Sequence, residues 1–122
     1  MNKHEFRAKD YLLHMLEAVD RVLQYTVDVS EQDFFASQLL QDAVVRNIEI
    51  IGEAAKNLLE AGPEFAARHP VIPFAQIYGM RNRVSHGYFA VSTEMIWDSV
   101  QVDIPELREQ IAKVLVELQT EE

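Results

Sequence analysis

The sequence predicts an all-α protein, an up-and-down bundle of roughly four to five main helices in one domain over residues 1–122. Apolar residues recur at three- and four-residue spacing through long stretches, with charged residues between them, as in amphipathic helices. Glycine and proline stand mainly at the ends of these stretches, where helices stop. No stretch shows the period of two that is typical of half-buried strands. A chain of 122 residues is long enough for one core and too short for two.

The first two helices are expected over residues 5–28 and 31–61. Ser30 is a suitable N-cap for the second, because its hydroxyl can accept a hydrogen bond from an exposed backbone N–H of the first turn. This second helix is long, and a break is expected near residues 34–37. It should end at the glycine–proline pair at 62–63, since proline cannot continue a helix.

The next segment, residues 63–73, contains three prolines and predicts a connector with one short turn of helix. A third main helix is expected over residues 74–85, ended by Gly87. The last helix is expected over residues 94–119.

Two features of the last helix follow from its sequence. Ser92 or Thr93 can cap its N-terminus. Pro105 lies inside its apolar pattern and should kink the helix or split it in two, because proline lacks a backbone N–H and its ring clashes with the preceding turn.

The composition excludes several classes of protein. The chain has no cysteine, so it has no disulfides, thiolate metal sites or thiol nucleophiles. No apolar run approaches the roughly 20 residues of a membrane span, and the charged N-terminal segment lacks the apolar core of a signal peptide, so a cytoplasmic protein without membrane contact is expected. A net charge of -9 argues against a general nucleic-acid coat, but it permits a local site for one or two phosphates.

One segment differs in charge from the rest of the chain. Residues 65–93 contain no aspartate or glutamate, although the chain has 20 acidic residues. The cationic and imidazole side chains of this segment are Arg68, His69, Arg81, Arg83 and His86. An acid-free, arginine-bearing segment in an acidic chain favours an anion, most readily phosphate. The alternative is a polar helix end whose charges cluster without a ligand.

Arg81 and His86 together supply the groups needed to cleave RNA without a metal ion. The arginine offers donors matched to phosphate oxygens, and a histidine near the negative end of a helix dipole can accept or donate a proton near neutral pH. The 2′-hydroxyl would attack the adjacent phosphate, so DNA would not be a substrate. No carboxylate cluster for Mg²⁺ accompanies the motif. The alternative is structural: His86 caps the helix and Arg81 forms a salt bridge.

The spacing of the two residues constrains how they meet. Five residues of ideal helix turn by roughly 500°, which leaves Arg81 and His86 about 140° apart around the axis. They can share a pocket if the helix ends or tightens before His86, or if a two-fold dimer brings two motifs face to face. We expect both to operate.

The second helix carries residues that could support this site. Glu49 and Glu53 recur at helical spacing and could orient Arg81 or Arg83; the alternative is a solvated charged face or a structural ion pair. Gly52 on the same helix predicts close approach of a neighbouring helix.

Three further residues receive no catalytic role. Trp97 is expected in the core or a dimer interface rather than against a base. His14 and His4 lie ten residues apart on the first helix, and no second pair of ligands accompanies them at three- or four-residue spacing, so no metal site is predicted there.

Residues 81–88, Arg-Asn-Arg-Val-Ser-His-Gly-Tyr, resemble the R-x-x-x-x-H-x-Y signature of the HepT-like toxins, a branch of the HEPN ribonuclease superfamily. The resemblance extends to residues 41–56, which are similar to the family's second helix, and to residues 72–82 and 97–107 downstream. It covers nearly the whole chain in order. One departure is Phe74, which stands where a tryptophan is common and should pack equivalently.

This resemblance implies a HEPN-like helical bundle that dimerises with its motifs lining a shared cleft. It implies a metal-independent endoribonuclease without a cofactor, in which Arg81 and His86 are catalytic and Asn82 supports them. We count Arg83 and Glu53 as further supporting residues.

The resemblance also implies a partner. Such toxins, in type II- or VII-like toxin–antitoxin systems, are paired with a minimal nucleotidyltransferase antitoxin of the MntA type. This antitoxin can attach AMP to the motif tyrosine, which is Tyr88 here, and can form a higher hetero-oligomer with the toxin. The alternative is a non-catalytic HEPN module that binds a nucleotidyltransferase and helps to present its substrate.

Overall fold

In the computed structural model, the backbone is described for residues 3–86 and 92–121, and the side chains for residues 8–82 and 92–120. Within these ranges all regular secondary structure is helical, which confirms the predicted all-α fold. The helices are α1 (Lys3–Thr26), α2 (Glu31–Ala36), α3 (Gln38–Ala61), α4 (Pro63–Arg68), α5 (Phe74–His86), α6 (Thr93–Asp98), the π-helix η1 (Ser99–Asp103) and α7 (Ile104–Glu121).

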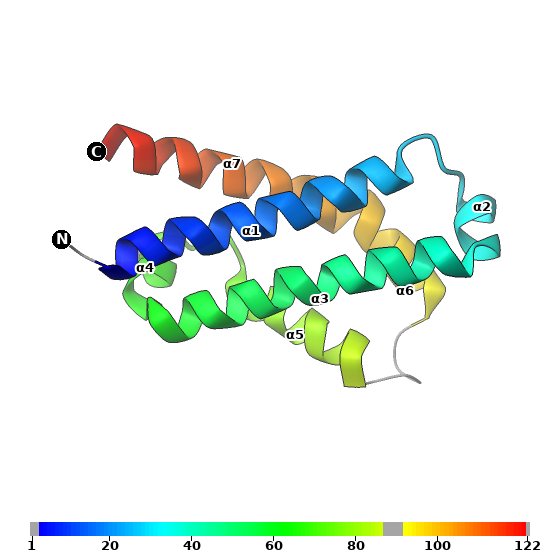
Figure 1. Ribbon diagram of the computed structural model, residues 1–122, viewed down its shortest axis with the longest axis horizontal. Coiled ribbons are helices and arrows are strands. Elements are labelled where there is room, and N and C mark those ends of the chain that lie inside the picture. Colours follow the sequence, from blue (N-terminus) through cyan, green and yellow to red (C-terminus); the bar gives the residue numbers. More distant parts are fainter. Residues whose placement is uncertain (1–2, 87–91, 122) are drawn as a thin grey trace.

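The long helices run up and down beside one another (Figure 1). Helices α1 and α3 are antiparallel neighbours, α5 packs against α3, and α7 packs against α1. Helix α3 is therefore the common support of α1 and α5, which places it at the centre of the arrangement that carries the motif helix.

The break expected near residues 34–37 is confirmed at Ser37. This residue has an extended conformation (φ -113°, ψ 100°), and it ends α2 while its hydroxyl caps α3 by accepting a hydrogen bond from the Leu40 N–H at 3.1 Å. The Gln41 side chain donates to the freed carbonyls of Phe34 and Phe35 at 3.0 and 3.1 Å. The break therefore leaves these backbone groups satisfied.

The other predicted caps are also found. Ser30 accepts a hydrogen bond from the Asp33 N–H at 3.1 Å, and Ser92 accepts one from the Met95 N–H at 3.2 Å. Helix α3 ends at Gly62, and Pro63 begins α4, the short helix expected in the proline-rich connector.

Pro105 changes the hydrogen-bond pattern of the last helical region, and the chain turns between α6 and α7 (Figure 1). The region stays helical, but residues 99–103 adopt a wider π-helical turn, which ends two residues before the proline. A wider turn suits this place because the proline ring would clash with the carbonyl four residues earlier in an α-helix and offers no N–H to it.

The buried apolar residues form one cluster, to which every long helix contributes side chains. Phe34 and Trp97 lie at its α2–α6 end with ring centroids 5.1 Å apart, and Trp97 is a core residue as predicted. Phe74 is also buried, in agreement with the packing role expected for it. The largest fully buried side chains are Phe34, Leu12, Met15, Leu58, Ile72, Ile111, Val19, Val22, Val44 and Val114. Of the helices described, none combines the length and apolar character of a membrane-spanning segment.

Candidate functional site

Arg81 lies on α5 and reaches across to α3. Its side chain is 26% exposed, and its Nη2 lies 3.4 Å from the Oε2 of Glu53, which is 48% exposed. Its Nη1 donates a hydrogen bond to the Asn82 side-chain oxygen at 3.1 Å. The structure therefore brings together Arg81, Asn82 and Glu53, three of the residues that the sequence selects.

The predicted close approach at Gly52 is confirmed, because the stem of Arg81 lies directly against this glycine. Gly52 and Glu53 are adjacent on α3, so the same turn accommodates the arginine stem and offers a carboxylate to its guanidinium. The sequence indicated a close helix approach at Gly52 but not that Arg81 would occupy it.

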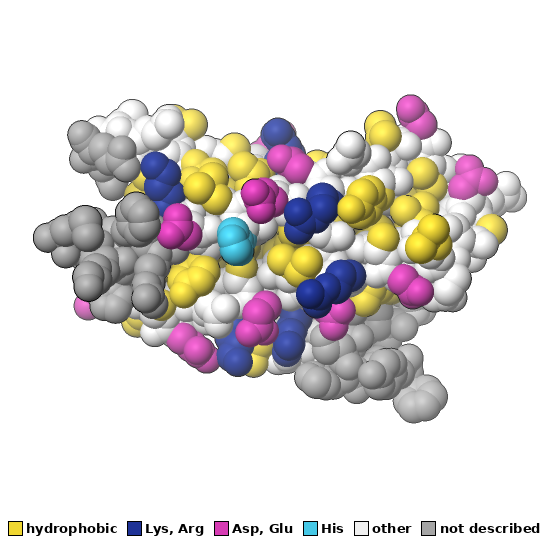
Figure 2. Space-filling view, viewed as in Figure 1, with side chains coloured by type: hydrophobic (Ala, Val, Ile, Leu, Met, Phe, Trp, Pro, Cys, Tyr) yellow, Lys and Arg dark blue, Asp and Glu magenta, His cyan; other side chains and the backbone are white. Residues whose placement is uncertain are grey.

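A cavity of about 500 Å³ opens beside the Arg81 guanidinium, between α1 and α3. It is lined by Tyr11, His14, Arg46, Glu49, Ile50, Glu53, Ala54, Asn57 and Arg81. Its size falls within the range of small-molecule sites. The face formed by α1 and α3 mixes basic, acidic and hydrophobic side chains (Figure 2).

Three polar residues of this cavity were missed as site residues by sequence reasoning, namely Tyr11, His14 and Asn57. No local signal identifies them, because their proximity to Arg81 depends on how α1 docks on α3. Glu49 and Glu53 do share the cavity, as their helical spacing suggested, and Arg46 of the same helix lines it too.

The motif helix does not end before the histidine. The helix was expected to end at about Ser85, and α5 extends through His86, the last residue described before the gap at 87–91. On a helix that includes both positions, the backbone at Arg81 and His86 remains about 140° apart around the axis. The tightening expected within one chain is therefore not found in the described backbone. Arg83 and His86 lie in α5 with side chains outside the described residues, and Gly87 and Tyr88 lie outside them altogether.

The acid-free segment does not remain free of acids in three dimensions. Glu53 of α3 approaches Arg81, and Glu117 of α7 places its Oε2 3.5 Å from the Nδ1 of His69. His69 also packs against Phe65, with ring centroids 4.5 Å apart. The salt bridge that the sequence left as the structural alternative for Arg81 therefore exists, and it does not exclude a role in binding phosphate, because the pair is partly exposed to solvent.

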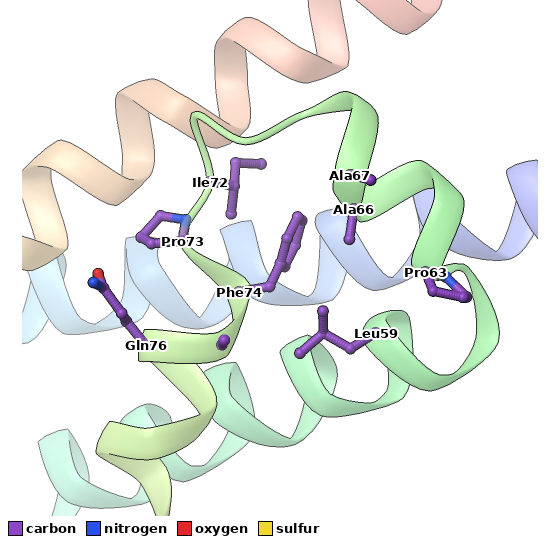
Figure 3. Close-up of a pocket in the computed structure, with 9 residues that line it drawn as sticks. Leu59, Pro63, Ala66, Ala67, Ile72, Pro73, Phe74 and Gln76 are labelled. Atoms are coloured by element: carbon purple, nitrogen blue, oxygen red, sulfur yellow. The ribbon is translucent and has the colours of Figure 1, made fainter.

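A second hollow, of about 420 Å³, has a different character (Figure 3). Its lining comes from the end of α3, α4, the connector and the start of α5. The residues are Leu59, Pro63, Ala66, Ala67, Ile72, Pro73, Phe74, Ala75 and Gln76, none of which titrates. It offers no acid, base or nucleophile. Of the two hollows, the Arg81 cavity is therefore the one lined by titratable side chains. Among the described residues, no three His, Asp or Glu side chains come together as a group that could hold a metal ion.

Comparison with known proteins gives this arrangement a family. The family described as "Ribonuclease HepT-like" matches residues 15–114, which include α3, α5 and the residues around Arg81. The chain belongs to this HepT-like ribonuclease family.

Curated relatives of this HepT-like chain carry ribonuclease names. It is 37% identical over 106 residues to the "Probable ribonuclease HepT" of Thermococcus cleftensis, which covers 87% of this chain and 94% of the relative. It is 37% identical over 107 residues to a "Putative RNase" of Caldanaerobacter subterraneus, covering 88% of this chain and 93% of the relative.

A third relative is longer. It is the "Gamma-glutamylcyclotransferase and putative RNase" of Methanocaldococcus jannaschii, 46% identical over 110 residues. The match covers 90% of this HepT-like chain but only 48% of that relative, so the chain spans about half of its length. No solved structure matches the chain significantly.

Proposed function

We propose that this chain is a metal-independent endoribonuclease that acts in the cytoplasm as the toxin of a toxin–antitoxin pair. The observation that carries the proposal is the Arg81 guanidinium, positioned by Glu53 and Asn82 at the edge of a cavity, on the helix that also contains His86. Membership of the HepT-like ribonuclease family supports RNA as the substrate.

The proposed reaction uses only groups of the RNA and the protein. The 2′-oxygen forms a bond to the adjacent phosphorus, and the bond from phosphorus to the 5′-oxygen of the next nucleotide breaks. The products are a 2′,3′-cyclic phosphate and a free 5′-hydroxyl. His86 takes part in moving the proton from the attacking 2′-hydroxyl to the departing 5′-oxygen. Arg81 stabilises the negative charge that grows on the phosphoryl oxygens. Asn82, Arg83 and Glu53 support the arginine.

The chemistry can be tested with a pool of randomised single-stranded RNA oligonucleotides and the matching DNA pool. Cleavage should persist in excess EDTA, leave cyclic phosphate ends and fail on DNA. Arg81→Ala and His86→Ala should each raise the barrier by roughly 2–4 kcal/mol, about 30- to 1000-fold in rate. Arg108→Ala is a matched control for the lost arginine, because Arg108 pairs with Asp20 on an exposed surface at 2.8 Å. Parental rates in either motif variant would remove that residue from the mechanism, and a requirement for Mg²⁺ would replace the metal-free route.

We propose further that a two-fold homodimer completes the site, with Arg81 of one chain and His86 of the other facing one phosphate. The motive is that α5 runs through both positions, so one chain turns them to different sides of the helix.

Mixed dimers test this arrangement directly. When the Arg81→Ala and His86→Ala proteins exchange subunits, each mixed dimer regains one site with both groups intact. Activity should therefore reappear on mixing two inactive proteins. Mixtures that stay inactive despite proven subunit exchange would show that each chain supplies its own complete site.

We also propose that an MntA-like minimal nucleotidyltransferase is the antitoxin and that it transfers AMP from ATP to the Tyr88 hydroxyl, releasing pyrophosphate. The adduct would bring a bulky anion two residues from His86, where the RNA phosphate must bind, so it should silence cleavage. Incubation with ATP and the nucleotidyltransferase encoded beside this chain should add one or more AMP masses to the parent and none to Tyr88→Phe, which should still cleave RNA. An equal mass increase on Tyr88→Phe would place the modification elsewhere. Binding of the nucleotidyltransferase by a chain that cleaves no RNA would favour the non-catalytic HEPN module.

A further inference from the structure

Gly52 leaves no room for a side chain where α3 meets α5. A Cβ built on Gly52 would overlap the Cβ of Arg81 and would lie 2.6 Å from its Cγ and 3.4 Å from its Cα. Real Cβ atoms essentially never come within 3.0 Å of another heavy atom. The atoms that would be overlapped are the first two carbons of the arginine side chain, and rotation of the side chain does not move its Cβ, so a rotation cannot relieve the overlap.

The same packing covers part of the guanidinium. Arg81 Nε is buried and has no hydrogen-bond partner among the described residues. The outer nitrogens, by contrast, lie against Asn82 and Glu53, and Arg81 is one of the residues that line the cavity. Contact with the α3 backbone therefore holds the inner part of the side chain, while the two outer nitrogens remain directed toward polar groups.

We propose that Gly52 is a positioning residue for RNA cleavage, because its missing side chain sets how deeply the Arg81 stem lies against α3. The depth of the stem decides where the guanidinium emerges at the cavity. This inference rests on the proposed catalytic role of Arg81. It goes beyond close helix packing, because the group that occupies the space is the phosphate-binding arginine itself.

Gly79 provides a matched control within α5. Both glycines lie inside α-helices, but a Cβ on Gly79 would meet nothing within 4 Å. Alanine favours the helix over glycine, so Gly79→Ala should raise Tm by a few degrees and leave cleavage of the randomised RNA pool unchanged. Gly52→Ala gains the same helix preference, yet it should lower Tm by several degrees and reduce the rate at saturating RNA by about tenfold or more, with less effect on KM. The first expected result is therefore that Gly79→Ala raises Tm and Gly52→Ala lowers it.

Removing the arginine stem gives a second test that does not depend on the single variant folding well. In an Arg81→Gly background the space beside residue 52 is open, so Gly52→Ala should become stabilising, as Gly79→Ala is. The residual cleavage of Arg81→Gly should also be unchanged by the second substitution, with every rate measured below the melting range. A glycine whose empty space serves a neighbour other than the Arg81 stem would lower Tm and residual cleavage equally in both backgrounds, and that outcome would overturn the proposal.

These measurements separate failure of the inference from failure of the proposed function. The Tm comparison contains no RNA, so it reports the Gly52–Arg81 coupling whatever the reaction is. If Arg81→Ala cleaves at the parental rate, the catalytic role of Arg81 is lost while the coupling can still be observed. If Arg81 is essential but Gly52→Ala behaves like Gly79→Ala, only the positioning role of Gly52 is wrong.

Discussion

The two sides of α3 meet their neighbours in different ways. Toward the α1 side, the packing is built mainly from buried apolar side chains, and α1 alone contributes Ala8, Leu12, Met15, Ala18, Val19 and Val22. Toward α5, the described side chains include one buried apolar residue, Phe74, with Ile77 and Met80 partly buried. The central contact on that side is a glycine against the stem of an arginine.

Under the proposed function, this difference lets one helix serve both stability and RNA cleavage. Apolar burial against α1 supplies free energy of folding without fixing any single polar atom. The α5 contact instead fixes the base of a charged side chain and leaves its outer end partly exposed. Truncation of buried apolar residues on the α1 side should therefore lower the free energy of unfolding without changing cleavage, whereas substitution of the partly exposed Arg81 or Glu53 should mainly change cleavage.

The largest effect on stability is expected on the α1 side. Met15 is fully buried, so Met15→Ala should lower the free energy of unfolding by about 2–5 kcal/mol through lost burial and a new cavity. Cleavage per folded molecule should stay at the parental value. Denaturant titration measures the first quantity, and Leu39→Ala is a control in which an 82% exposed side chain on α3 is lost. A fall in cleavage beyond the loss of folded protein would show that the α1 side also tunes the site.

An intermediate effect is expected at the polar contact between α1 and α3. Asn47 is buried; its side-chain oxygen accepts a hydrogen bond from Arg21 Nε at 2.7 Å, and its amide donates to the Ala43 carbonyl at 2.8 Å. Asn47→Ala should cost about 1–3 kcal/mol of stability, because buried hydrogen-bonding groups lose their partners. A double-mutant cycle with Arg21→Ala should show coupling, whereas additive losses would mean that this hydrogen bond contributes little.

The smallest effect on stability is expected on the α5 side. The Arg81–Glu53 pair is partly exposed, so Glu53→Gln should change the free energy of unfolding by no more than about 1 kcal/mol, and less in high salt. Cleavage should nevertheless fall, though by less than in Arg81→Ala, because Glu53 orients the guanidinium. Glu60→Gln, an exposed carboxylate further along α3, should change neither quantity. Unaltered cleavage in Glu53→Gln would leave the pair as a surface salt bridge only.

Much of the helical layout could be predicted from local sequence signals. Ser30 and Ser92 mark helix starts because a hydroxyl before the first turn can satisfy exposed N–H groups, and the break at Ser37 follows the same rule. The disturbance expected at Pro105 has a local cause too, because proline breaks the α-helical hydrogen-bond pattern. That this disturbance takes the form of a π-helical turn does not follow from the proline alone.

The candidate site was harder to predict from the sequence, because it depends on how the helices pack against one another. Glu53 was a candidate partner of Arg81 from its spacing, but the depth of the arginine stem against Gly52 is a distance between helices that no periodicity encodes. The surroundings of the acid-free segment could not be predicted either, because Glu53 and Glu117 lie beside it only once the other helices have packed against it.

The order of the helices along the chain has a kinetic consequence. The layer that presents Arg81 consists of α1, α3 and α5, each packing on a helix close to it in sequence. Helix α7 instead closes on α1, where the Asp20–Arg108 contact joins residues 88 positions apart. Short loops close faster than long ones, so we expect the α1–α3–α5 layer to assemble first and α7 to dock late. Substitutions in α7 should then mainly speed unfolding, while those between α3 and α5 slow folding.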